Sequence, residues 1–139
     1  MKVVPVPVRE DNYAYLLIDE STNKAAAIDP FDVSKVSAAA DVHGVKIIAG
    51  ITTHHHFDHS GGNKVCNFQP LSPCPLILKQ FRNLFVISPN LVYTTYFHIL
   101  QASKYPNVTI YGGSDKIPAV TKLLLDKDEF YIGDHIHVR

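Results

Sequence analysis

The chain has little cysteine and no excess of charge of either sign. Only two of its 139 residues are cysteines, Cys66 and Cys74, which is too few for a disulfide framework. Thirteen basic residues balance thirteen acidic ones, so the chain lacks the field that would attract nucleic acid or an anionic membrane. No charged segment followed by an apolar run opens the chain. We therefore expect a protein of the cytoplasm, with a mitochondrial form as the alternative, that acts on a small molecule.

The hydrophobic pattern of the first 63 residues predicts four strands and one helix. Pro5 and Pro7 interrupt the first apolar run, as an edge strand tolerates. The polar residues 19–23 predict a hairpin turn between the second and third runs. Apolar residues at helical spacing predict a helix over Val33–His43, which Gly44 caps. The expected strands are Val3–Val8, Tyr13–Ile18, Ala25–Ile28 and Val45–Ile51.

The segment 66–101 differs in composition from the rest of the chain. It holds four of the nine prolines but no glycine and no acidic residue. Residues 83–101 carry no formal charge, yet they are too polar for a membrane span. We hypothesise that the segment is translated intron, because the absence of glycine and acidic residues fits noncoding DNA better than a selected fold. Removing residues 65–101 would then join Lys64 to Ala102. The alternative is a genuine insertion that forms a surface hairpin or an interface.

The last part of the chain regains an ordinary composition. Val108–Tyr111 has the pattern of a strand, and Gly112 with Gly113 predicts a turn after it. A short helix is expected over Ile117–Leu125, entered through Pro118. A hairpin is expected over Tyr131–Val138, with its turn at residues 133–134.

Four residues that commonly bind metals follow directly after the apolar strand Val45–Ile51. Side chains alternate along an extended backbone, so the first two histidines point the same way and can bind one divalent ion, while His55 points elsewhere. A helix that starts near the aspartate would direct the other two side chains at a second ion. The alternative is a histidine-rich surface turn that binds metal ions only adventitiously. The four residues are His54, His56, Asp58 and His59.

The pattern T-H-x-H-x-D-H after an apolar strand resembles the signature of the metallo-β-lactamase superfamily. The resemblance implies an α/β fold, the αββα sandwich that binds one or two metal ions at a sheet edge. More narrowly, segments over residues 1–64 and 102–139 are similar to glyoxalase II, the hydroxyacylglutathione hydrolase. These segments include Asp11-Asn12-Tyr13, Ala27-Ile28-Asp29-Pro30, Ser60-Gly61-Gly62-Asn63 and Tyr111-Gly112-Gly113-Ser114-Asp115.

The resemblance to glyoxalase II implies hydrolysis of S-D-lactoylglutathione to D-lactate and glutathione. His54 and His56 would then bind the first metal, and Asp58 and His59 the second. Asp29 would steady the loop that carries these ligands, or it would only end a strand. Zinc is the expected metal, although histidine and carboxylate ligands suit iron and manganese equally well.

The family completes its metal site with two histidines and a bridging aspartate that have no counterpart in this chain. Asp134, His135 and His137 match the family's turn and strand before the third histidine, so we expect a structural role for them. We therefore interpret residues 1–139 as one partial domain with impaired activity. The alternatives are a metal-binding fragment without catalysis and another enzyme of the superfamily, such as a persulfide dioxygenase. A partial sandwich also leaves apolar sheet surface uncovered, which favours self-association.

Overall fold

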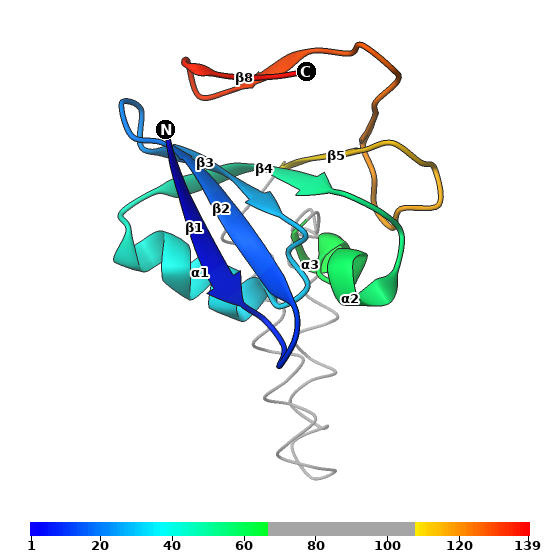
Figure 1. Cartoon of the computed structure of the whole chain (residues 1–139), viewed down its shortest axis with the longest axis horizontal. Coiled ribbons are helices and arrows are strands. Elements are labelled where there is room, and N and C mark those ends of the chain that lie inside the picture. Colours follow the sequence, from blue (N-terminus) through cyan, green and yellow to red (C-terminus); the bar gives the residue numbers. More distant parts are fainter. Residues whose placement is uncertain (67–107) are drawn as a thin grey trace, which may run out of the picture.

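The computed structural model describes residues 1–66 and 108–139. A six-stranded sheet forms the centre of the fold, with its strands in the order β1-β2-β3-β4-β5-β6 (Figure 1). The first three strands pair antiparallel, and each later neighbour pairs parallel to the one before it. The strands are β1 (Lys2–Pro7), β2 (Tyr13–Asp19), β3 (Lys24–Ile28), β4 (Lys46–Thr52), β5 (Thr109–Gly112) and β6 (Lys122–Leu123).

The predicted elements of the first 63 residues are confirmed. The proline-containing strand β1 lies at the edge of the sheet, and β2 and β3 form the expected hairpin. Helix α1 (Val33–Val42) links β3 to the parallel strand β4. The Asp32 side chain caps this helix by accepting from the Lys35 N–H at 3.1 Å, and Gly44 follows it with a φ of 64°. Two one-turn helices then follow β4, α2 (Phe57–Ser60) and α3 (Asn63–Cys66).

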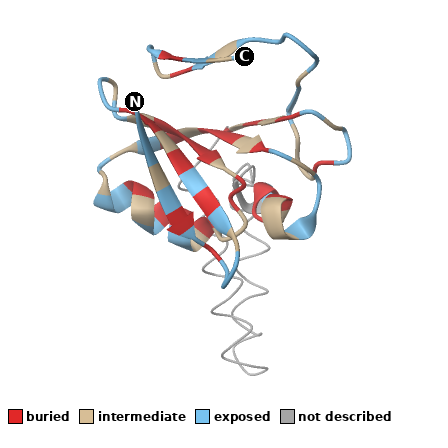
Figure 2. Ribbon diagram, viewed as in Figure 1, coloured by how far each residue is buried: buried red, intermediate tan, exposed pale blue. Residues whose placement is uncertain are grey.

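Each face of the sheet has its own apolar cluster. Helix α1 covers one face, where Leu16, Val36 and Ile110 are almost fully buried. On the other face, the hairpin of β7 (Phe130–Ile132) and β8 (Ile136–Val138) places Ile132 and Ile136 against the middle of the sheet. Figure 2 shows buried and exposed positions alternating along much of β2. The result is a layered α/β arrangement in which the sheet lies between the helix and the hairpin.

The predicted helix over Ile117–Leu125 is wrong. The first part is a turn, in which the Val120 N–H donates to the Ile117 carbonyl at 3.3 Å. The chain then bonds to strand β5: the Thr121 N–H donates to the Ile110 carbonyl and the Leu124 N–H to the Gly112 carbonyl, both at 2.9 Å. Between them lies the short strand β6. The edge of β5 offers backbone partners to this segment, whereas a helix of so few residues is unstable by itself.

The hairpin predicted over Tyr131–Val138 is confirmed, with Gly133 at its turn at a φ of 64°. The predictions for 66–101, both the intron and the insertion, lie outside the described residues apart from Cys66 at the end of α3. Within residues 1–66 and 108–139, no helix has the length and apolar character needed to cross a membrane.

Candidate metal centre

The candidate site lies where the parallel strands β3 and β4 end side by side. Ile28 pairs with Ile51, so the residues that follow the two strands emerge at the same edge of the sheet. Asp29 follows β3, and Thr53 follows β4 and begins the histidine-rich loop. The loop therefore starts next to a carboxylate that comes from 24 residues earlier in the chain.

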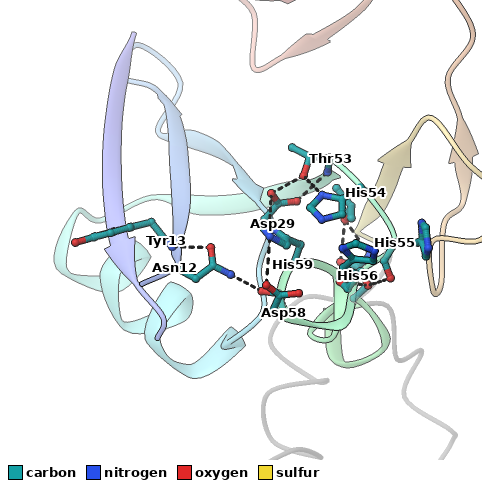
Figure 3. A network of polar contacts seen from close by, with 12 residues as sticks. Asn12, Tyr13, Asp29, Thr53, His54, His55, His56, Asp58 and His59 are labelled. Atoms are coloured by element: carbon teal, nitrogen blue, oxygen red, sulfur yellow. Dashed lines mark hydrogen bonds and ion pairs between the residues drawn. The ribbon is translucent and has the colours of Figure 1, made fainter. Parts of the chain in front are cut away.

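Asp29 joins the two ends of the histidine-rich loop (Figure 3). One carboxylate oxygen accepts from the Thr53 N–H at 2.8 Å. The other accepts from the Thr53 hydroxyl at 2.7 Å and from the ring Nδ1 of His59 at 3.0 Å. The carboxylate is nearly buried and its residue has a φ of 47°, a left-handed conformation that aspartate tolerates better than most residues. The geometry is that of a residue that fixes the loop.

The hydrogen bonds around Asp29 also define the tautomers of two histidines. The His59 Nδ1–H donates to the Asp29 carboxylate. The Thr53 hydroxyl donates its hydrogen bond to the same carboxylate. Its oxygen is therefore left to accept from the Nδ1–H of His54, 3.0 Å away. A ring whose proton is on Nδ1 carries its lone pair on Nε2, the atom with which histidine binds a metal; the Nε2 of His59 faces the Asp58 carboxylate.

The rings of the motif gather closely. His54 lies 4.1 Å from His59 and 4.7 Å from His56 between ring centroids. His55 meets His56 edge-on, with 5.0 Å between ring centroids, and points away from the other two rings, as the alternation predicts (Figure 3). The polypeptide therefore presents three imidazoles on one side of the loop.

Asp58 and His59 form a second close pair, at the start of α2. The carboxylate Oδ2 of Asp58 lies 3.4 Å from the Nε2 of His59. Two ligands of a tetrahedral zinc ion with bonds of about 2.0 Å lie about 3.3 Å apart, so this separation suits one shared ion. Helix α2 begins at Phe57, which confirms the helix expected near Asp58.

The potential ligands nevertheless gather in pairs. Within 1–66 and 108–139, no three histidine, cysteine, aspartate or glutamate side chains are grouped closely enough to hold one ion. The imidazole and carboxylate donors fit a divalent metal in kind, and the Asp58–His59 pair also fits it in spacing. Each pair would leave most of the coordination positions of its ion to other groups.

Residues outside the motif hold the loop from several sides. The buried Ser60 hydroxyl contacts the His55 and His56 carbonyls at 3.0 and 2.9 Å. The fully buried Asn63 amide donates to the Thr52 hydroxyl at 2.9 Å, which ties the end of the loop to its beginning. Asn12 donates to the Asp58 carbonyl at 2.7 Å. Sequence reasoning did not assign these supports, although Asn12, Ser60 and Asn63 all lie in segments that resemble glyoxalase II.

Comparisons with known proteins bear on both the fold and the family. No family model matches the chain. A stretch of 64 residues, 46% of the chain, is 56% identical to the cytoplasmic hydroxyacylglutathione hydrolase of Arabidopsis thaliana. Among solved structures, BLEG-1, a B3 metallo-β-lactamase, aligns with 95% of the chain at a TM-score of 0.51 and 16% identity. The chain has the metallo-β-lactamase fold.

The predicted fold class and the resemblance to glyoxalase II are both confirmed. The match covers 25% of the length of the Arabidopsis hydrolase, and the structural alignment covers 57% of the BLEG-1 chain. The chain thus spans only part of each relative.

Asp134 and His135 lie at the other end of this metallo-β-lactamase sheet. Asp19 pairs with Lys24, and Lys24 pairs with Lys46, at the ends of β3 and β4 opposite the histidine-rich loop. The Asp134 N–H donates to the buried Asp19 carboxylate at 2.9 Å, and His135 Nδ1 lies 3.3 Å from it. The turn of the β7–β8 hairpin is therefore fastened to the β2–β3 turn.

The Asp19 carboxylate is unusually rich in donors. The Ser21 hydroxyl, the Asp134 N–H and the Thr22 hydroxyl all donate to it and hold its pKa well below its ordinary value. Ser21 and His135 also contact each other, so the cluster contains the residue types of a catalytic triad. The Ser21 hydroxyl and the Asp19 carboxylate, however, both contact Nδ1 of the His135 ring. A catalytic relay needs them on opposite nitrogens of the ring. The cluster is therefore suited to fastening two turns together.

Proposed function

We propose that the chain carries half of a metal-dependent thioester hydrolase of the glyoxalase II type. The reaction is the hydrolysis of S-D-lactoylglutathione to D-lactate and glutathione, the last step in the detoxification of methylglyoxal. The observation that carries the proposal is the Asp29-anchored loop, which brings His54, Asp58 and His59 together directly after strand β4. The 56% identity to a hydroxyacylglutathione hydrolase supports the thioester substrate.

In this proposal the four motif residues hold two zinc ions. His54 and His56 would hold the first, and Asp58 and His59 the second. Bound zinc would supply Lewis acidity and activate water near neutral pH. The protein's own part is to hold the histidines in a fixed orientation on one side of the loop. Asp29 and Thr53 do this by accepting hydrogen bonds from the Nδ1–H groups of His59 and His54.

Activity is expected to be weak, because each pair supplies only two ligands. A catalytic zinc site has three protein ligands, and loss of a ligand weakens both the affinity for the metal and its chemistry. The same observation favours a second candidate function, a metal-binding fragment without catalysis. A cytoplasmic location is part of the proposal and rests on the relative, whose name describes a cytoplasmic enzyme.

Turnover by the purified chain tests the proposal. The zinc-loaded chain is incubated with S-D-lactoylglutathione, and release of the free thiol is followed. A double variant, His54→Ala with Asp58→Ala, removes one ligand from each pair. The matched control, His135→Ala with Asp134→Ala, removes the same residue types at the opposite end of the sheet.

Slow, zinc-dependent turnover that the motif variant loses and the matched control retains is the expected result. Equal rates in the unaltered chain and the motif variant would contradict the proposal. Zinc binding without turnover would decide in favour of the metal-binding fragment.

A further inference from the structure

The side chain of Asn12 connects two parts of the chain that lie 46 residues apart in sequence. Its amide Nδ2 donates to the backbone carbonyl of Asp58 at 2.7 Å, a short and therefore well-formed hydrogen bond (Figure 3). This carbonyl belongs to the peptide bond between Asp58 and His59. Asn12 therefore contacts the backbone between the two residues that the proposed function assigns to the second zinc ion.

Asn12 is itself held in place by the turn between β1 and β2. Its backbone carbonyl accepts from the N–H groups of Val8 and Arg9 at 3.1 and 3.2 Å. Its side-chain oxygen accepts from the Tyr13 N–H at 2.8 Å. With both oxygens engaged in the turn, the amide nitrogen has a fixed direction and points at α2.

Helix α2 needs such external support, because it consists of a single turn. A helix of four residues cannot satisfy its last carbonyls internally, and a single turn is unstable by itself. Asp29 holds the ring of His59, but it does not hold the peptide that precedes this residue. The orientation of that peptide sets the directions in which both Asp58 and His59 leave the backbone.

We propose that Asn12 is a positioning residue for the second metal pair. By fixing the peptide between Asp58 and His59, it keeps the carboxylate and the imidazole at the separation that one ion requires. The inference rests on the metal-binding part of the proposed function and is independent of thioester turnover. It also gives the first hairpin of the chain a role in the chemistry of a loop far away in sequence.

Zinc titration of the full chain tests this role, with calorimetry resolving the first and second equivalents. Asn12→Asp replaces the donor with an oxygen that faces the Asp58 carbonyl. Asn12→Ser keeps an acceptor for the turn but does not reach α2. Asp11→Asn is the matched control, since it replaces a carboxylate with an amide at the exposed position next to Asn12.

We expect both Asn12 variants to bind the second zinc about tenfold more weakly, the lower end of the cost of losing an outer contact of a metal site. The first zinc, at His54 and His56, should bind within a factor of two of the unaltered chain. Circular dichroism identical to that of the unaltered chain shows that each variant is folded.

Three outcomes would overturn the inference. Equal affinity for the second zinc in Asn12→Ser and Asp11→Asn would show that the contact does not position the pair. Equal weakening of both equivalents would show a role in folding only. Absence of a second zinc in the unaltered chain would overturn the inference and the two-metal proposal together. Two zinc ions bound without turnover would contradict only the hydrolase activity.

Discussion

Gly62 is the position where one added methyl group tests how tightly the loop is packed. It is buried, and a Cβ atom there would collide with the backbone carbonyl oxygen of Pro30 and lie 2.8 Å from the Val33 side chain. Pro30 directly follows Asp29, so the collision would push the loop away from its anchoring carboxylate. A backbone carbonyl cannot rotate aside as a flexible side chain can.

The expected cost of Gly62→Ala follows from this contact. Overpacking a tight interior costs about 1–3 kcal/mol, and a collision with backbone belongs at the upper end, about 3 kcal/mol. With a urea dependence of about 2 kcal/mol per molar, the unfolding midpoint should fall by about 1.5 M. Gly113→Ala is the matched control, because nothing lies within 4 Å of the added atom.

Urea unfolding followed by circular dichroism provides the measurement. The control should change the free energy of unfolding by less than about 1 kcal/mol, the usual range for glycine-to-alanine changes at compatible sites. If Gly62→Ala and Gly113→Ala unfold at the same urea concentration, the close packing of the loop against Pro30 is refuted.

Three further predictions concern Asp29, Asp19 and the uncovered sheet face. Asp29→Asn keeps the shape and the left-handed backbone but loses charge-assisted bonds, and should cost about 2 kcal/mol of unfolding free energy. Asp32→Asn, its control, exchanges one good helix cap for another and should be nearly neutral in the same urea assay. The lowered pKa of Asp19 means that its contribution is complete above the unfolded pKa of about 3.9 and is lost as pH falls through the lower folded value. The acid limb of a plot of stability against pH should therefore flatten in Asp19→Asn, and an unchanged limb would contradict this assignment. Tyr13 and Tyr15 are exposed on β2, so their joint replacement by serine should reduce self-association in sedimentation experiments, whereas identical sedimentation would exclude this surface.

Local patterns were sufficient to predict most of the framework. The β2–β3 hairpin, helix α1 and strand β4 each follow from the periodicity and turn residues of their own segment. The alternation of His54 and His56 away from His55 also follows from the extended backbone. These features depend on neighbours within a few residues.

The features that were not predicted from the sequence depend on contacts between residues far apart in the chain. Residues 121–124 bond to β5 because its edge is available, a fact that no pattern within the segment contains. The contact of Asn12 with Asp58 and the three bonds of Asp29 join residues 24–46 positions apart. The resemblance to a known family marked these positions, and the structure supplied their physical roles.

The zinc content of the chain after dialysis to equilibrium against a buffer of fixed zinc concentration tests the central claim most directly, because it asks whether the histidine-rich loop binds metal at all. The account predicts that the unaltered chain retains zinc and that His54→Ala with His56→Ala loses most of the first equivalent. The control His135→Ala with His137→Ala, which removes two histidines from the distant hairpin, should retain it. Equal zinc contents in the two double variants would contradict the account.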